Sequence, residues 1–427
     1  MNWRSTAAGY TQPAMADNLF DILKARGFIA QSTETEAAMR ERLATPLVAY
    51  NGFDPTADSF HVGTLVPIMA LYWMQQCGHK PVALIGGATA LVGDPSFKND
   101  ARKMLTVAEV AANCRALGGQ LARLLRFDDS ASGALLVNNA DWLGTLNWIE
   151  LLRAVGPHFS VNRMLSMDSV KGRMDAGGIT FLEFNYMVMQ AYDFMHLRRT
   201  LGCTLQTGGQ DQWGNIVMGI ELCRRCDAQE VAGLTFPLVT KADGTKFGKS
   251  EKGNVWLSAE RTSPYEFFQF WRNVADSDVQ RFFGFFTMLP MAEVAELCAP
   301  GADINRAKER LACEITTLIH GAAIAEQARA DARKAFGADQ DLSGDSIPHG
   351  PLPRSEADGG IGLLGLMVRA GLAPSNSEAR RLVEGGGVRI HDRAVTDPKT
   401  AVTASDIIAG RIVLRAGKKR LYRFDIT

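Results

Sequence analysis

Four polar side chains recur at intervals of three, four and three residues within an otherwise apolar segment, residues 181–197: Glu183, Tyr186, Gln190 and Asp193. In an α-helix this spacing places all four on one face. The other faces are almost wholly apolar, which predicts a buried helix, and buried carboxylates and amides need hydrogen-bond partners. The polar stripe therefore contacts either other protein groups, in a self-satisfied network, or a ligand.

A second chemical pattern follows the apolar run over 47–53, where a turn-rich loop leads into His-Val-Gly-Thr at 61–64. The loop after a parallel strand faces the crevice where α/β sheets bind ligands, and N–H groups at a helix start are free for an anion. Gly63 permits close approach of a nucleotide, and His61 can donate to a phosphoryl oxygen. The pattern indicates phosphate binding, with a plain strand-to-helix turn as the alternative.

Two lysines flank a glycine in Lys-Phe-Gly-Lys-Ser, residues 246–250, after the strand-like run Phe-Pro-Leu-Val-Thr. Such a loop can fold over a triphosphate and neutralise the charge that grows on the departing pyrophosphate. A Walker A loop is excluded by spacing, because its first glycine would be residue 243, which is Asp, and no long amphipathic helix follows. For this segment alone, a solvated basic turn remains the alternative.

The elements that must position these loops follow an α/β pattern. Residues 47–87 contain an apolar run, a turn-rich loop, an amphipathic stretch over about 62–77 and a second apolar run, which predicts a βαβ unit. Further short apolar runs alternate with helical patterns over the first ~250 residues, so we expect a Rossmann-like parallel sheet. From Ser263 to about Ala335 the strand pattern disappears and the spacing is helical.

Charge and composition divide the rest of the chain. Residues 339–360 are rich in Gly, Pro, Ser and Asp, which predicts a linker. The segment 361–427 carries 12 Lys or Arg against 6 Asp or Glu, whereas the whole chain has 46 of each. A nucleic-acid-binding surface is therefore expected in this last segment. The predicted domains are 1–260, 261–338 and 361–427.

Composition also excludes several classes of protein. No apolar run approaches the ~18 residues of a membrane span and the N-terminus lacks a signal-peptide layout, so we expect a cytoplasmic protein. The acid-free opening segment, residues 1–15, leaves a weak transit peptide, a disordered tail and a start at Met15 all open. The seven cysteines are scattered, and Cys223 and Cys226 have no second pair at zinc spacing, so no metal site is predicted.

Taken together, the segments 61–64 and 246–250 resemble the HxGH-type and KMSKS-type loops of class I aminoacyl-tRNA synthetases. The resemblance implies that the first loop binds the triphosphate and adenosine of ATP and that the second closes on the pyrophosphate. Two positions depart from the pattern. Thr64 replaces a second His that often contacts the ribose, although a hydroxyl can substitute, and Phe247 replaces a common Met without changing the charge of the lysines.

Residues 50–56, 93–96 and 208–215, together with the stripe at 181–197, closely resemble bacterial tyrosyl-tRNA synthetases, in the family's order and over nearly the whole chain. The resemblance implies a tyrosine–tRNA ligase that makes tyrosyl-adenylate from tyrosine and ATP and then transfers tyrosine to tRNA(Tyr). The implied tyrosine-binding residues are Tyr50 and Asp193 for the phenol, Asp94, Tyr186 and Gln190 for the α-ammonium group, and Gln212 near the carboxylate. Phenylalanine would leave the two phenol-binding groups unpaired.

The resemblance also implies contacts to ATP. The expected ATP-binding residues are Asp54, His61, Gly63, Thr64, Gly209, Asp211, Lys246, Lys249 and Ser250. The residues expected to act on the phosphates during the reaction are Thr56, His61, Lys98, Arg102, Lys246 and Lys249. The tyrosine carboxylate is already ionised and can attack the α-phosphorus in line, so catalysis needs positioning and charge stabilisation rather than a general base. We expect Mg²⁺ to accompany ATP, without a dedicated protein cage.

The C-terminal segment resembles the small α+β S4-type RNA-binding fold that ends bacterial tyrosyl enzymes. We expect Ser377 to cap a helix that presents Arg380 and Arg381, and glycines to end that helix before a short strand that carries Arg389. The resemblance implies that these arginines contact RNA. A basic solubilising appendage is the alternative.

The resemblance further implies that the helical domain, 261–338, binds the anticodon arm of tRNA and that the segment 146–165 is a connecting insertion used for homodimer contact. Two rival functions remain at this stage. A tryptophanyl synthetase shares the core fold, and a non-catalytic RNA-binding relative would keep the fold without the activity. The intact charged residues of both loops and of the stripe argue against the second, because an inactive site has no physical reason to retain buried charge.

Overall fold

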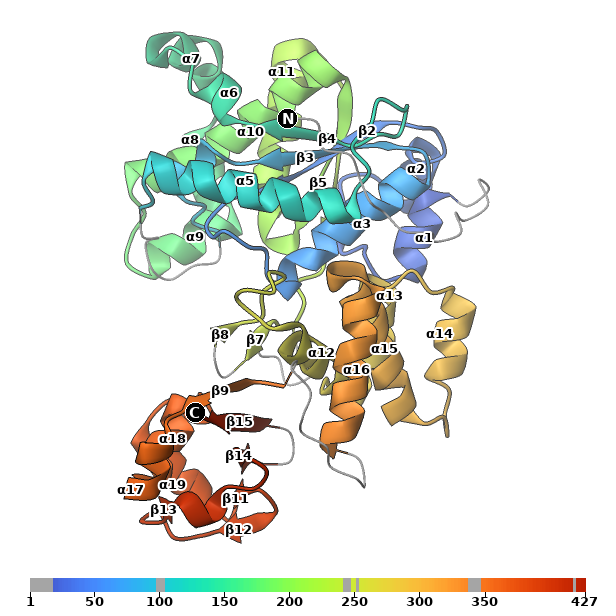
Figure 1. Cartoon of the computed structure of the whole chain (residues 1–427). Helices are drawn as coiled ribbons and strands as arrows, with labels where there is room; N and C mark the ends of the chain where they lie inside the picture. Colours follow the sequence, from blue (N-terminus) through green and yellow to red (C-terminus); the bar gives the residue numbers. More distant parts are fainter. Residues whose placement is uncertain (1–17, 97–103, 241–246, 251–252, 337–346, 418–419) are drawn as a thin grey trace. The chain divides into compact units, whose positions relative to one another are not determined.

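The computed structural model describes residues 18–96, 104–240, 247–250, 253–336, 347–417 and 420–427 (Figure 1). The chain divides into two compact units. The first comprises residues up to Phe247 together with Ala275–Ala307, and the second comprises Gly248–Val274 and Lys308–Thr427. No helix among the described residues is long and apolar enough to cross a membrane.

The first unit is built on a six-stranded sheet with the strand order β1-β6-β5-β2-β3-β4. The strands are β1 (Gln31–Ser32), β2 (Val48–Phe53), β3 (Lys80–Ile85), β4 (Leu135–Asn138), β5 (Cys203–Gly209) and β6 (Ala232–Phe236). β1 runs antiparallel to β6, and the other neighbours are parallel. All five residues of β6 are buried, as expected for a parallel sheet that helices cover on both faces.

The direction of the chain explains which helices cover which face. The chain steps from β2 to β3 to β4 in one direction and then returns to β5 and β6 in the other, so right-handed crossovers place their helices on opposite faces. α3 (Leu65–Gln76) and α5 (Val107–Leu124) lie on one face, and α10 (Phe181–Leu201) and α11 (Trp213–Asp227) lie on the other (Figure 1). The reversal falls between the adjacent strands β2 and β5, which is where open α/β sheets bind ligands.

Local sequence sets the bounds of α10. Thr180 and Glu183 form a capping box at its start, and Gly202 ends it in the left-handed conformation with φ of 68°. α3 differs from the amphipathic helix that the sequence predicted, because nine of its 12 residues are buried. The difference arises because α3 packs on the sheet and also contacts α1, α5 and α13.

The remaining elements of the first unit are shorter. They are α1 (Leu19–Ala25), α2 (Glu36–Arg42), η1 (Val62–Thr64), α4 (Thr89–Val92), α6 (Ala140–Leu143), α7 (Trp148–Ala154), η2 (Gly156–His158), α8 (Val161–Ser166), α9 (Asp168–Asp175), η3 (Gln210–Gln212), η4 (Asp276–Asp278), α13 (Val279–Phe286) and α14 (Met291–Leu297).

A buried guanidinium ties the N-terminal part of this unit to α13. Arg26 donates to the carbonyl oxygens of Gly284, Thr287 and Leu289 at 3.3, 2.9 and 2.8 Å, and its guanidinium lies 3.9 Å from the centre of the Trp73 ring. Burial lowers the pKa of Arg26 to about 10, so the group stays charged at neutral pH. The side chain therefore satisfies carbonyls at the end of α13 that the helix itself leaves unpaired.

The second unit contains a short hairpin, helices and a small α+β region. The hairpin is β7 (Lys249–Ser250) with β8 (Gly253–Asn254), and the helices are α12 (Pro264–Arg272), α15 (Ile304–His320), whose first residues belong to the first unit, and α16 (Ala322–Phe336). Every regular element among the described residues from 264 to 336 is helical, in agreement with the sequence pattern.

The C-terminal region has its own sheet, in the order β12-β11-β14-β15-β9. Its elements are β9 (His349–Leu352), α17 (Arg354–Gly359), β10 (Ile361–Gly362), α18 (Leu363–Arg369), α19 (Asn376–Glu384), β11 (Val388–Ile390), β12 (Arg393–Val395), β13 (Ala401–Val402), η5 (Ala404–Asp406), β14 (Arg411–Ala416) and β15 (Arg420–Ile426). A single apolar core that includes Leu366, Val383, Leu414 and Phe424 lies among them.

Two features of this region differ from the sequence-based expectation. β9 and α17 lie within the stretch where we expected a linker, and β9 pairs in parallel with β15. The cap of α19 is Ser375 rather than Ser377, because the Ser375 hydroxyl accepts from the Glu378 N–H at 3.3 Å. Ser375 and Glu378 have the three-residue spacing of a capping pair, which identifies the cap in the sequence.

Candidate active site

The polar residues that the sequence singled out converge at the carboxyl ends of the parallel strands. Asp54 follows β2, Asp94 lies in the connection after β3, Asn139 follows β4 and Asp211 follows β5. Carboxyl ends of parallel strands share one edge of the sheet, so these loops are neighbours at the point where the strand order reverses.

Asp193 lies at the base of this site, on the buried face of α10. One carboxylate oxygen accepts from Nδ2 of Asn139 at 3.0 Å, and the other accepts from Nε1 of Trp142 at 2.7 Å. Burial raises the pKa of Asp193 to about 7, against the lowering effect of these two donors, and the charge of Asp54 raises it further. The site thus holds a carboxylate that is costly to ionise and is oriented by two hydrogen bonds.

Tyr50, in β2, presents a buried hydroxyl beside this carboxylate. The side chain is 1% exposed and its ring packs on Phe194 at 5.4 Å, while its hydroxyl has no hydrogen-bond partner within the described part of the chain. Burial, and then the charge of Asp193, raise the pKa of Tyr50, so the hydroxyl is protonated. A buried unpaired hydroxyl is costly, and here it offers both a donor and an acceptor to a ligand.

A chain of hydrogen bonds connects Asp193 with the nucleotide loop. Asn139 donates to the Thr89 hydroxyl at 3.1 Å, and that hydroxyl donates to Asp54 at 2.8 Å. The other Asp54 oxygen accepts from the Tyr186 hydroxyl at 2.8 Å. A Cβ on the neighbouring Gly86 would lie 2.2 Å from Asp54 Oδ1, so a side chain at that position would displace the carboxylate.

A second network gathers the groups expected around the α-ammonium and carboxylate of the amino acid. Asp94 is 7% exposed and accepts from Nε2 of Gln212 at 2.8 Å. Asn215 donates to Gln190 at 2.9 Å and to Gln212 at 3.2 Å. The structure therefore brings Asp94, Gln190 and Gln212 together, whereas Tyr186 is partnered with Asp54.

The nucleotide loop is shaped by a histidine cap. The Gly63 N–H donates to Nδ1 of His61 at 3.1 Å at the start of η1. Burial lowers the pKa of His61, so its ring is neutral at pH 7 and carries its proton on Nε2. That N–H can donate to a phosphoryl oxygen. Thr64 makes no side-chain cap, and Thr56 is exposed.

The loop after β5 also shows a close approach between backbone and side chain. A Cβ on Gly209 would lie 2.4 Å from Oδ1 of Asp211, so a side chain at this position would displace the carboxylate. Asp211 and Gln212 lie together in η3, and Nε2 of Gln212 is 3.4 Å from Asp211. The Asp211 carboxylate therefore lies next to backbone that carries no side chain, at Gly209.

The structure does not describe the side chains of several expected phosphate-binding residues. Lys98, Arg102 and Lys246 lie outside the described residues, and only the backbone of Lys249 and Ser250 is described, in β7. Their roles stay predictions.

Phe247 is described, and it is 7% exposed, with its ring 4.5 Å from that of Phe282 and 6.1 Å from that of Phe286. The aromatic ring that replaces the usual Met therefore anchors the chain next to the lysines in an apolar cluster.

Comparison with known proteins identifies families whose sequences match this chain. Residues 42–337 match the family of class I tRNA synthetases for tryptophan and tyrosine (W and Y), and residues 349–424 match the tyrosine–tRNA ligase SYY-like C-terminal domain. The tyrosine–tRNA ligase of Bradyrhizobium diazoefficiens is 48% identical over 410 residues, which cover 95% of this chain and 98% of the relative. The chain belongs to the tyrosine–tRNA ligases.

Further relatives of this family agree. The tyrosine–tRNA ligase of Brucella suis is 51% identical over 402 residues, 93% of this chain and 96% of that protein. A C-terminally truncated mitochondrial tyrosyl-tRNA synthetase of Aspergillus nidulans has a TM-score of 0.68 and 30% identity, covering 75% of this chain and 94% of that structure. The predicted family, the fold class and membership of the class I aminoacyl-tRNA synthetases are therefore confirmed.

Within this tyrosine–tRNA ligase, Glu183 does not have the environment of the other stripe residues. It closes the capping box of α10 and accepts from Arg173 at 3.0 Å. Burial tends to raise the pKa of Glu183, but the hydrogen bonds from Thr180 and the Arg173 guanidinium lower it overall. For Glu183, a self-satisfied hydrogen-bond network within the protein, rather than a ligand, therefore explains the polar residue on this face of the helix.

Sequence reasoning missed four residues that hold the site together: Thr89, Asn139, Trp142 and Asn215. Asn139 and Trp142 follow β4 in the motif Asn-Asn-Ala-Asp-Trp, which places polar groups at the end of a buried strand, as Asp54 follows β2. That strand-end position was the available signal. No feature of the sequence indicated that they pair with Asp193.

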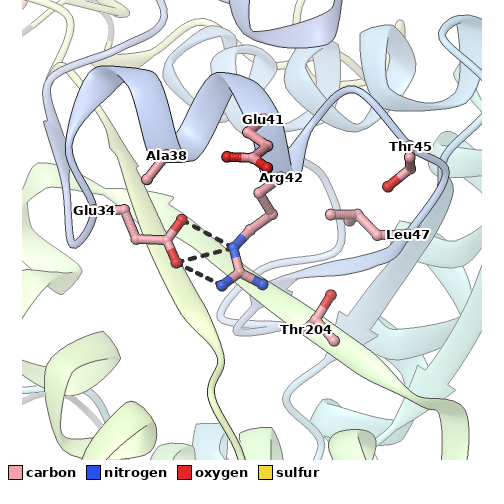
Figure 2. Close-up of a pocket in the computed structure, with 7 residues that line it drawn as sticks. All are labelled: Glu34, Ala38, Glu41, Arg42, Thr45, Leu47 and Thr204. Atoms are coloured by element: carbon pink, nitrogen blue, oxygen red, sulfur yellow. Dashed lines mark hydrogen bonds and ion pairs between the residues drawn. The ribbon is translucent and has the colours of Figure 1, made fainter.

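A separate pocket of about 410 Å³ lies at the opposite end of the strands, because Leu47 directly precedes β2 and Thr204 is at the start of β5 (Figure 2). Its lining residues are Glu34, Ala38, Glu41, Arg42, Thr45, Leu47 and Thr204. Figure 2 shows the Arg42 guanidinium turned toward Glu34, with Nε to Oε2 at 2.9 Å. Since the pocket's cation is already neutralised, it lacks what a phosphate needs.

No group of three or more His, Cys, Asp or Glu within the described ranges could hold a metal ion.

Proposed function

We propose that this chain activates L-tyrosine with ATP, releasing pyrophosphate, and transfers tyrosine from the adenylate to the 3′ end of tRNA(Tyr). The observation that carries the amino-acid specificity is the pair formed by the Tyr50 hydroxyl and the Asp193 carboxylate. Tyr50 lacks a partner in the described part of the chain, and Asp193 is fully buried between two donors.

The Tyr50 hydroxyl and the Asp193 carboxylate together match a phenol and discriminate against amino acids that lack one. The phenol of tyrosine can donate to Asp193 and accept from Tyr50, so both buried groups gain a partner. Phenylalanine fits the same space but leaves the Tyr50 hydroxyl unpaired and gives Asp193 no third donor, and the penalty for an unpaired buried polar group is about 1–3 kcal/mol. Specificity therefore comes from polar groups that only one amino acid satisfies.

The polar groups on the second network bind the other end of tyrosine. In our proposal Asp94 and Gln190 accept from the α-ammonium group, and the Tyr186 hydroxyl joins them by turning from Asp54. Gln212 is bonded to Asp94 at 2.8 Å and can donate to the reacting carboxylate. Holding both ends of the amino acid fixes its carboxylate for in-line attack, which is the main contribution of proximity to rate.

ATP binds across the neighbouring loops in this proposal. His61 and the position without a side chain at Gly63 face the phosphates, Thr64 faces the ribose, and Gly209 with Asp211 contacts the ribose of the adenylate. Asp54 and Ser250 belong to the ATP-binding set as well, and the remaining phosphate contacts come from Thr56, Lys98, Arg102, Lys246 and Lys249. These groups stabilise charge that develops on the α-phosphate and on pyrophosphate. Mg²⁺ bound to ATP supplies further charge neutralisation.

The C-terminal region supplies the RNA-binding surface in this proposal. Arg380 and Arg381 are exposed on α19, and Arg389 is exposed on β11. The opposite side of α19 is buried, with Ala379 and Val383 in the core, so the helix presents its arginines from a fixed support. Arginine side chains can contact phosphates in this geometry and position the RNA without reading its sequence. The helical domain, 261–338, holds the anticodon arm.

A homodimer is the proposed assembly, in the cytoplasm. Large apolar side chains are exposed along α7 and at the start of α10, namely Trp148, Ile149, Leu152 and Phe181, which are 50, 60, 44 and 71% exposed. The rings of Trp148 and Phe181 touch, with centres 6.4 Å apart, so these residues form one patch. Such a patch marks an interaction site, and a monomer in light scattering would contradict the dimer.

The central test is amino-acid-dependent ATP–pyrophosphate exchange. We expect exchange with tyrosine and little with tryptophan or phenylalanine at equal concentration. Tyr50→Phe removes the unpaired hydroxyl with little change of shape, so it should weaken tyrosine binding while leaving the KM for ATP near its normal value. Exchange that depends on tryptophan instead, or on no amino acid, would contradict the proposed function.

A further inference from the structure

Asp193 can serve a phenol only if its carboxylate is held in one orientation, and its two donors are held very differently. Asn139 is fully buried and has further bonds, to the Thr89 hydroxyl and from the Ala88 N–H at 2.8 Å. Its position is therefore fixed from three directions. Trp142, the other donor, has no such network.

The backbone around Trp142 gives the indole little support. Trp142 lies in the four-residue helix α6, and its N–H is 3.4 Å from the Asn139 carbonyl oxygen. That distance lies beyond the usual range for such a bond, whereas the Trp142 carbonyl accepts from the Thr145 hydroxyl at 2.9 Å. These bonds hold the backbone and do not set the side-chain torsion angles of the indole. The indole is also only partly buried. Side-chain contacts must therefore fix the plane of the ring.

The indole packs against the buried apolar cluster that contains Ala191 and Phe194, and the ring of His196 provides the stacking contact on its face. It stacks on the indole of Trp142 with ring centres 4.4 Å apart and planes 15° apart, and the Tyr192 ring lies 6.5 Å from it on the same helix. Burial, and then the charge of Arg199, lower the pKa of His196, so two neutral rings are in contact at pH 7.

His196 and Asp193 are three residues apart on α10 and so lie on the same side of the helix. The indole is attached to α10 twice, by its N–H to Asp193 and by its face to His196. Two attachments to one rigid helix define both the position and the tilt of the indole.

We propose that His196 is a positioning residue for tyrosine, because its ring holds the Trp142 indole in the plane from which Nε1–H points at Asp193. The inference rests on the proposed function, since it assigns a determinant of tyrosine affinity. His196 itself does not touch the substrate in this account. Its effect passes through one hydrogen bond, so it should act on the amino acid and not on ATP.

The size of the effect follows from the contact. A stacked aromatic pair contributes about 0.5–1.5 kcal/mol, which corresponds to roughly a 2- to 13-fold change in affinity. His196→Ala should raise the KM for tyrosine in pyrophosphate exchange, and the Kd for tyrosine in equilibrium dialysis, by a factor in this range. The KM for ATP and kcat should stay unchanged. His196→Phe, which keeps a flat ring, should restore the normal tyrosine values.

Two further variants separate positioning from general damage to α10. Thr200→Ala removes an exposed side chain one turn further along, whose hydroxyl donates to the His196 carbonyl, and it should leave all constants unchanged. Trp142→Phe removes the N–H itself, so adding His196→Ala to it should have no further effect on tyrosine affinity.

Three results would overturn the inference: no change in the tyrosine constants of His196→Ala, no rescue by His196→Phe, or the same factor in the Trp142→Phe background. These outcomes differ from failure of the proposed function, in which the unaltered protein would show no tyrosine-dependent exchange. An active parent protein with an unaffected His196→Ala variant refutes the inference alone.

Discussion

The buried carboxylate of Asp193 should make the stability of the catalytic unit depend on pH in an unusual direction. Burial raises its pKa from an ordinary 3.8 to about 7. Between these two values the folded protein holds a proton that the unfolded chain has released, so stability falls as pH rises. The slope from this group is about 1.4 kcal/mol per pH unit, and the whole range amounts to about 4 kcal/mol.

Asp193→Asn removes the titration and keeps the shape. The amide nitrogen of the new side chain would face a donor, either Asn139 or Trp142, and the lost hydrogen bond should cost about 1–3 kcal/mol at every pH. We therefore expect the variant to be the less stable protein near pH 5 and the more stable one at pH 8. The same variant should lose tyrosine-dependent pyrophosphate exchange by about 100-fold or more, since the phenol loses its charged acceptor.

Hydrogen exchange of the α10 amides, followed by mass spectrometry from pH 5 to 8 and corrected for intrinsic exchange, measures the local opening free energy. The difference between the two proteins should change by roughly 1.4 kcal/mol for each pH unit below 7 and level off above it. Parallel curves for the two proteins would refute the reasoning, because they would mean that Asp193 is not protonated in the folded state near pH 6. Asn185→Ala, which removes a partly exposed side chain near the start of α10, provides a control that should follow the parent protein.

Three other predictions follow from the packing. Gly86→Ala should raise the KM for tyrosine about 10-fold, because overpacking costs about 1–3 kcal/mol and its Cβ would displace Asp54; a normal KM would contradict this. Arg26→Ala should lower the free energy of unfolding by about 3 kcal/mol in urea titration, since three carbonyls lose a charged donor, and an unchanged midpoint would count against that. Replacing Arg380 and Arg381 by Ala should weaken tRNA binding and reduce its salt dependence, whereas Arg354→Ala on α17 should not.

Much of the active site could be predicted because its signals are local. The spacing of Tyr186, Gln190 and Asp193 places them on one helix face whatever the fold, and loops after parallel strands face one edge of any such sheet. These rules need only the period of the helix and the direction of the strands. The α/β class followed from the same patterns.

The partners of these residues could not be predicted, because they depend on which segments meet. Asn139 and Trp142 are more than 50 positions from Asp193, and the sequence carries no sign that β4 ends beside α10. Glu183 shares the spacing of the stripe, yet its position in the first turn of α10 gives it a capping role. A periodic pattern identifies a face but not what lies against each point of it.

The extent to which α3 is buried could not be predicted from the sequence either. Its strongly polar side chains, Gln75 and Gln76, lie at its end, and the sheet and the neighbouring helices cover almost all of the helix. Burial of that extent depends on the number of layers in the domain, which a local pattern does not contain.

The hydrogen-bonded chain from Trp142 through Asp193, Asn139 and Thr89 to Asp54 has a consequence for redesign. Each member between the two ends bonds to two neighbours, so replacing one of them leaves the next with an unsatisfied buried group. Substitution effects along this chain should be strongly non-additive. Converting the pocket to a non-phenolic amino acid would therefore require several simultaneous replacements, and libraries that vary one position at a time should yield few active enzymes.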